Sequence, residues 1–218
     1  MHGANGEWRN APTGRSVFLT AVFDTLEMKM EMYDYTYLIR RKVFSFLGAA
    51  FHIYDPSGRL IGFSKQKAFK LKEDIRVYTD ESKQQELLVI KARNIIDFSA
   101  SYDVFDPAAN MLLGTWQRKG FSSMLRDKWA LYDFNGVQIG EINEDQMSLA
   151  LVRRFVCNVI PQNYSLMYGS GQEAAAYSQC FNPFVFKLKV RINPGCTLSP
   201  HLILAGGILL AAIEGRQS

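Results

Sequence analysis

The sequence has few of the residues that usually carry catalysis or bind metals. Its 218 residues include only three histidines and three cysteines. None of the histidines lies in a Ser-His-Asp, Cys-His or H-E-x-x-H pattern. The cysteines are odd in number, far apart and outside any zinc-type spacing, so they predict neither a disulfide framework nor a zinc site. We therefore assign no catalytic residue, no metal and no cofactor, and we expect a reducing, cytoplasmic environment.

The sequence also has little excess of one charge and no phosphate-binding loop. Its 25 Lys and Arg against 21 Asp and Glu give a formal net charge of +4. That charge is modest and no aromatic platform motif accompanies it, so we do not expect nucleic-acid binding. Gly169-Ser170-Gly171 lacks the Lys and the preceding strand that a glycine-rich phosphate loop needs. A mildly basic chain remains compatible with acidic partners.

The composition is that of one folded domain. The chain is 48% hydrophobic and 21% charged, close to the globular norm, and a chain of this length buries roughly 70% of its unfolded surface. We interpret residues 1–32 as an N-terminal extension, poorly ordered or the product of an over-extended gene start, because three methionines close it. The main domain is then 33–218.

A hairpin unit recurs three times in the middle of the chain. Each copy has aromatic residues, an Asp at the start of a turn, a turn that closes on Gly or Asn, and a Gly on the return strand. The copies begin at Phe51, Tyr102 and Trp129. Their aspartates are expected to accept hydrogen bonds from the backbone of their own turns, which accounts for Asp55, Asp106 and Asp133 without a catalytic role. The left-handed backbone of such turns is expected at Gly58, Asn110 and Gly136.

Other segments also alternate between apolar and polar residues, as antiparallel strands do. We predict further strands over 36–45, 68–79, 86–99 and 184–193. A helix is predicted over 144–155.

The C-terminal segment predicts a buried helix. Ser199 suits the N-cap, Pro200 the first helical position and Gly215 the residue after the end. A helix over 201–214 would be roughly 21 Å long, short for a bilayer core of about 30 Å. Its apolar residues surround the whole axis, which indicates burial. The pair Gly206-Gly207 would cost about 1 kcal/mol per residue in an isolated helix, so we expect other groups to approach closely there.

The alternating strands and the wholly apolar helix together predict the architecture. An antiparallel sheet that is long enough to curl and close has an interior, and a wholly apolar helix can fill it. We therefore predict a mainly β protein, a closed antiparallel barrel around the helix at about 200–214.

The sequence resembles the superfamily of the tubby C-terminal domain, the phospholipid scramblases and the LURP-one-related proteins. The three hairpins, the segment QRKGFSSMLRDKW at 117–129 and the final PHLILAGGILLAAIE carry this resemblance, which covers roughly residues 35–214. It implies a barrel of about twelve strands around a buried C-terminal helix. It also implies a choice of functions, because tubby domains bind phosphoinositide headgroups and scramblases are associated with calcium-dependent lipid movement. Fold alone does not select one.

The sequence lacks the motif expected for a calcium-dependent function. Scramblases have an acidic segment shortly before the last helix, whereas this chain has RINPGCTLSP at 191–200, with no carboxylate. No segment matches an EF-hand loop.

The tubby-like function would depend on basic side chains. In FVFKLKVRI at 184–192, alternate residues place three cations on one strand face. Near an anionic membrane each Lys or Arg contributes on the order of 1 kcal/mol. The candidate headgroup ligands are Lys187, Lys189, Arg191, Lys65, Lys67, Lys70, Lys72, Arg118 and Lys119. The alternative interpretation is a solvated strand face whose lysines protect a sheet edge.

The leading hypothesis is therefore a non-enzymatic barrel that binds an anionic phospholipid headgroup or a protein partner at its outer surface, peripheral to a membrane. One alternative is a scramblase-like protein whose helix inserts into the bilayer. A second is an enzyme or small-ligand carrier with a cavity inside the barrel. The sequence does not indicate the oligomeric state.

Overall fold

The computed structural model describes residues 35–42, 49–66, 74–96, 99–119, 128–144, 162–180 and 185–213. They belong to one compact unit that begins at Tyr35. The predicted extension 1–32, the predicted helix 144–155 beyond its first residue and the start of the predicted strand 68–79 lie outside the described residues.

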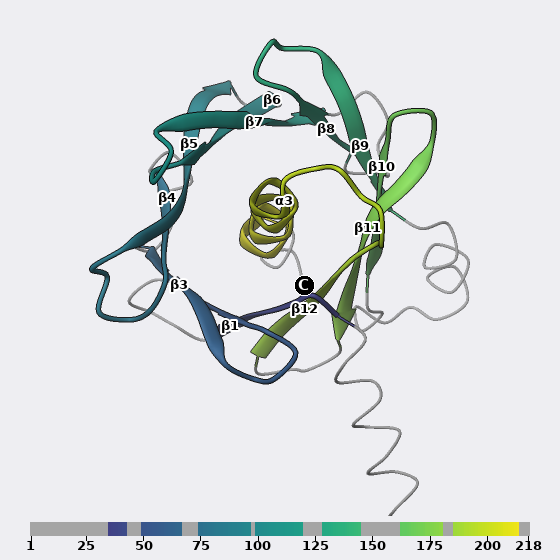
Figure 1. The fold of residues 1–218 in the computed structure, drawn as a ribbon. Helices are drawn as coiled ribbons and strands as arrows, with labels where there is room; N and C mark the ends of the chain where they lie inside the picture. The colour runs from purple at the N-terminus through teal and green to yellow at the C-terminus, as the bar shows by residue number, and fades with distance from the viewer. Residues whose placement is uncertain are drawn as a thin grey trace, which may run out of the picture. The chain divides into compact units, whose positions relative to one another are not determined.

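The described residues form twelve strands and one helix. The strands are β1 (Tyr37–Lys42), β2 (Ala49–Tyr54), β3 (Leu60–Gln66), β4 (Ile75–Tyr78), β5 (Glu86–Ile96), β6 (Ser99–Asp106), β7 (Met111–Lys119), β8 (Lys128–Tyr132), β9 (Gln138–Glu144), β10 (Asn163–Tyr168), β11 (Gln172–Cys180) and β12 (Val185–Ile192). Each strand pairs antiparallel with the next along the chain, and β12 pairs with β1, so the sheet closes into a barrel (Figure 1). The predicted closed antiparallel barrel is confirmed.

Period-2 alternation separates the inside of the barrel from the outside. In β12, Phe186, Leu188 and Val190 are buried, whereas the residues between them are half-buried and Arg191 is exposed. Buried side chains of eleven strands form one cluster with the helix, and Ile61 of β3 packs against it. The outward faces are polar because burying them would cost the solvation of their charged groups.

The helix α3 (Pro200–Ile213) lies inside the ring of strands (Figure 1). From Leu202 to Ala212 no side chain is more than 2% exposed, so the predicted burial on every face is confirmed. Ser199 accepts the first backbone hydrogen bond, from Leu202 N at 3.0 Å. No helix in the described part of the chain has both the length and the hydropathy of a membrane span.

The glycine pair explains how closely the barrel wall approaches the helix. A Cβ on Gly206 would lie 2.9 Å from Trp116 Cζ2, and one on Gly207 would lie 2.9 Å from Ile39 Cδ1. This close approach lets two wall side chains reach backbone carbonyls of the helix. The Trp116 indole N–H donates to Leu202 O at 3.0 Å, and the Tyr177 hydroxyl donates to Ile203 O at 3.0 Å.

The end of the helix also has a partner from the wall. Arg41 follows Ile39 on the inward face of β1 and is only 6% exposed. Its Nη1 donates to Ala211 O at 3.0 Å, and its guanidinium lies 5.8 Å from the centre of the Phe186 ring. The last turn of α3 has no basic residue of its own. Arg41 therefore supplies the positive charge that stabilises a helix C-terminus.

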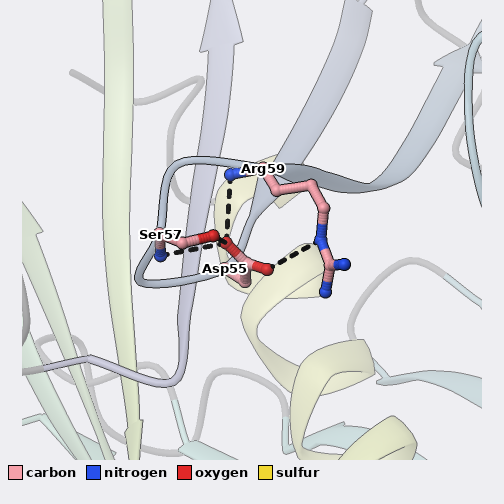
Figure 2. Close-up of polar contacts among 3 residues, drawn as sticks. All are labelled: Asp55, Ser57 and Arg59. Atoms are coloured by element: carbon pink, nitrogen blue, oxygen red, sulfur yellow. Dashed lines mark hydrogen bonds and ion pairs between the residues drawn. The ribbon is translucent and has the colours of Figure 1, made fainter.

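The three repeated hairpins are β2–β3, β6–β7 and β8–β9. Asp55 Oδ1 accepts hydrogen bonds from Ser57 N and Arg59 N, both at 3.0 Å, and Asp55 Oδ2 accepts from Arg59 Nε (Figure 2). Asp106 and Asp133 accept from backbone N–H groups of their own turns in the same way. The φ angles of Gly58, Asn110 and Gly136 are positive, at 79°, 48° and 80°. The predicted turn role of these residues is confirmed.

The Asp55 turn predicts a pH dependence of stability. The Ser57 hydroxyl, and then the backbone and side chain of Arg59, hold the pKa of Asp55 below its usual value. A carboxyl whose pKa is lower in the folded state stabilises the fold above its unfolded pKa, about 3.9, and this contribution disappears as pH falls through the folded value. Asp55→Asn should therefore reduce the fall in the thermal unfolding midpoint below about pH 4. Thermal melts across the acid range test this, and an unchanged acid limb would contradict it.

Candidate functional site

One group of four neighbouring strands contains basic residues and no acidic ones. Together β12, β1, β2 and β3 contain seven Lys and Arg and no Asp or Glu. By contrast, β6, β7, β8 and β9 on the other side contain three basic and four acidic residues. The barrel wall is therefore polarised. We call the outward side chains of the first group the basic face: Lys187, Lys189, Arg191, Arg40 and Lys65.

The register places two of these cations side by side. Arg40 of β1 lies directly opposite Lys187 of β12, and Leu38 lies opposite Lys189. On the other side of β1, Arg40 lies opposite His52 of β2. Like charges at directly opposite positions destabilise a sheet. The Arg40–Lys187 pair therefore does not stabilise the fold. Such a pair of like charges is expected where the protein binds an anion.

Because the barrel is closed, protection of a sheet edge does not explain the lysines of the basic face. Lys on an edge strand prevents the edge from pairing with another chain. However, β12 pairs with β11 and β1, and β1 pairs with β12 and β2. Neither strand is an edge. A solvated outer face requires polar side chains, but it does not require that they all have the same charge.

Acidic side chains reach the basic face from its borders. Glu173 of β11 lies 3.9 Å from Arg191. Glu81, in the turn between β4 and β5, lies 2.9 Å from His52 Nε2. The centre of the face, around Arg40 and Lys187, lies between these two contacts.

The structure brings together only some of the basic residues proposed from the sequence. Lys187, Lys189, Arg191 and Lys65 share the face described above. Arg118 and Lys119 lie on β7, six strands from β1 in either direction around the barrel, and so do not join it (Figure 1). Lys119 donates instead to Gln138 Oε1 at 3.2 Å. Lys67, Lys70 and Lys72 lie outside the described residues.

Two residues that sequence analysis did not propose belong to this surface. The Arg40 guanidinium lies 5.6 Å from the centre of the Tyr54 ring. The His52 ring stacks on Tyr54 at 6.4 Å and lies 5.1 Å from Phe63. Arg40 lies within the predicted strand 36–45, but Arg41 follows it directly, so the sequence pattern does not identify which of the two points outward. His52 gave no signal of its own, because its importance comes from its neighbours on β1 and β3.

Comparison with known proteins identifies the family. The family model described as LURP-one-related matches residues 61–210, which is 150 of the 218 residues. The chain belongs to the LURP-one-related family. No curated protein and no solved structure shows a significant match to it. The family match spans β3 to most of α3, so it includes the three cations of β12, whereas Arg40 precedes the matched range.

Proposed function

We propose that this LURP-one-related barrel is a non-enzymatic module that binds anionic phospholipid headgroups through its basic face. The observation that carries the proposal is the run of four paired strands that together contain seven Lys and Arg and no carboxylate. Clustered Lys and Arg gain on the order of 1 kcal/mol each near an anionic membrane. Five such side chains are enough for peripheral, reversible binding at low salt.

The charges at one end of the barrel support docking through the wall. The hairpin turns at the end where α3 begins, 55–59, 79–85, 106–110 and 133–137, contain five acidic and two basic residues. An anionic surface repels this end and attracts the wall formed by β12, β1, β2 and β3. The barrel would then lie with its axis along the membrane, so that several headgroups contact one convex surface.

Neutralisation of β12 tests the proposal. Lys187→Gln, Lys189→Gln and Arg191→Gln together remove three charges, so affinity for vesicles with phosphatidylglycerol should fall about a hundredfold. Co-sedimentation with phosphatidylcholine vesicles, with and without phosphatidylglycerol, measures this. Arg118→Gln, Lys119→Gln and Lys128→Gln form the matched control, since they remove the same residue types from β7 and β8.

The control variant should bind nearly as the unmodified protein does. An equal loss of binding in both triple variants would show that only net charge matters and would eliminate the basic face as the site. An absence of vesicle binding by the unmodified protein would instead leave an acidic protein partner as the ligand to test.

A further inference from the structure

The large apolar side chains that are exposed in the described part of the chain all lie on two neighbouring hairpins. They are Met111, Phe134 and Val137, with exposed fractions of 52%, 68% and 59%. We call these three side chains the apolar tip. Met111 begins β7 of the β6–β7 hairpin, and the other two belong to the turn of the β8–β9 hairpin. Single exposed apolar residues are ordinary, whereas several on one surface indicate an interaction site.

Strand pairing brings the members of the apolar tip to the same end of the barrel. The strands β7, β8 and β9 are neighbours in the sheet (Figure 1). Thr115 of β7 lies opposite Tyr132 of β8, so the residues that begin β7 run alongside the turn that follows β8. Tyr132 also lies opposite Gln138 of β9. The two hairpins therefore present one surface, at the end where α3 begins.

Hydrogen bonds within the turn 133–137 hold Phe134 and Val137 in position. Asp133 Oδ1 accepts from Asn135 N at 2.9 Å and from Val137 N at 2.8 Å. The backbone N–H of Asp133 donates to Val137 O at 2.9 Å. A side chain on a backbone that is already fixed loses less conformational entropy when a partner binds. The apolar tip is thus prepared for binding.

The two hairpins are also acidic. Residues 99–117 and 129–144 include no Lys or Arg. Their carboxylates belong to Asp103, Asp106, Asp133, Glu141 and Glu144. Asp103 is paired with Arg93 of the neighbouring strand β5 at 2.9 Å, and the turns themselves carry Asp106 and Asp133. A partner that docks on this surface is therefore selected for positive charge.

We propose that the apolar tip docks a protein segment in which a large apolar side chain stands next to Lys or Arg. The apolar side chain would cover Phe134 and Val137, and the cations beside it would face Asp106 and Asp133. An apolar centre within a charged rim is typical of protein interfaces. An anionic lipid surface does not fit, because these carboxylates repel it. The proposal is independent of the basic face, which lies on other strands.

The experiment selects random short peptides displayed on phage against the full chain. Phage that bind the double variant Phe134→Ser, Val137→Ser are removed beforehand. We expect the enriched peptides to combine Phe, Leu or Trp with an excess of Lys and Arg. By fluorescence anisotropy, the double variant should bind the synthetic peptides at least about tenfold more weakly, the effect of removing an apolar anchor.

Asn135→Ser is the matched control, because it changes the same turn and keeps both apolar side chains. It should bind the peptides as the unmodified protein does. The side chains of Phe134 and Val137 are exposed, so the double variant should keep the thermal unfolding midpoint of the unmodified protein.

A second pair of variants tests the charge. Asp106→Asn with Asp133→Asn keeps the side-chain oxygens that accept the backbone hydrogen bonds of the turns but removes both charges. Affinity for the peptides should fall about threefold at low salt, and the difference should decrease at high salt because exposed charges are screened. Asp55→Asn with Asp80→Asn makes the same change in the turns 55–59 and 79–85 and should have little effect.

Several outcomes would overturn the proposal. They are an absence of enriched peptides, enriched peptides without an excess of Lys and Arg, and an equal loss of affinity in both asparagine pairs. Dimerisation of the unmodified chain in sedimentation velocity, abolished in the serine double variant, would assign the apolar tip to a second copy instead. The serine double variant should bind phosphatidylglycerol vesicles as the unmodified protein does, and a loss of that binding would make the tip a lipid contact. Failure of vesicle binding by the unmodified protein would concern the basic face alone.

Discussion

A Gly206→Leu variant should lose at least about 3 kcal/mol of folding free energy. The Cβ alone would lie 2.9 Å from Trp116 Cζ2 and 3.0 Å from the Tyr177 hydroxyl oxygen. Both neighbours are large side chains that are 0% exposed, so neither has free space into which it can move. The remaining three carbons of leucine would push α3 away from the wall and break the hydrogen bonds of Trp116 and Tyr177 to the helix. Urea unfolding followed by circular dichroism measures the loss.

Alanine at the same position gives a second test, in which the sign of the change in folding stability is decisive. In an exposed helix, Gly→Ala stabilises by about 1 kcal/mol because alanine has the better helix propensity. Inside this barrel, Gly206→Ala should instead destabilise by about 1–3 kcal/mol. Gly207→Ala should behave in the same way, since its Cβ would lie 2.9 Å from Ile39 Cδ1 and 3.1 Å from Val190 Cγ2. A gain in stability in both alanine variants would mean that the helix is not enclosed.

Trp116→Ala should destabilise the fold by about 3–5 kcal/mol, the range for removal of a buried aromatic side chain. Trp116 is 0% exposed, and it joins the barrel wall to α3 by contact with Gly206 and by its hydrogen bond to Leu202 O. The variant loses both the packing and the hydrogen bond. The change in urea midpoint, at constant denaturant slope, measures the effect.

Trp116→Phe separates these two contributions. Phenylalanine keeps much of the ring volume but has no N–H donor, so the expected loss is only about 1–2 kcal/mol. The same loss in the alanine and phenylalanine variants would show that the contact with the helix backbone, and not the packing, dominates.

The sequence predicted the architecture because several local patterns agreed. Hairpin turns such as the one at Asp55 are determined by residues within a few positions of each other, and alternation indicates which residues of each strand are buried. The helix was recognisable from the same kind of local signal, since its apolar residues surround the axis. Even the close contact at Gly206 was predictable, because a glycine pair in a helix is unfavourable unless something approaches it.

The arrangement of the basic face was not predictable in the same way. It depends on the pairing that closes the barrel, in which Tyr37 lies opposite Val190. Those residues are far apart in sequence, and no local pattern specifies their register. The cations of β12 could therefore be proposed, but their neighbour Arg40 could not, and neither could the separation of Arg118 and Lys119 from them.

Arg41 shows a second limit of sequence patterns. A charged residue at an inward strand position interrupts the expected alternation, so the pattern suggests that it lies at the end of a strand or on the surface. In the structure Arg41 is buried, and its guanidinium donates a hydrogen bond to the backbone carbonyl of Ala211, near the C-terminal end of α3. That compensation comes from a helix at the other end of the chain.

In the proposed function, α3 stays inside its own barrel both when the protein is free and when it is bound to a membrane. Amide hydrogen exchange of residues 202–212, followed by mass spectrometry with and without phosphatidylglycerol vesicles, measures this. We expect these amides to be among the slowest to exchange in the protein, because they open only with the whole fold, and their protection should be the same with vesicles present. Exchange faster than in the strands, or a change of protection in α3 when vesicles are added, would contradict the account and favour a helix that leaves the barrel for the bilayer.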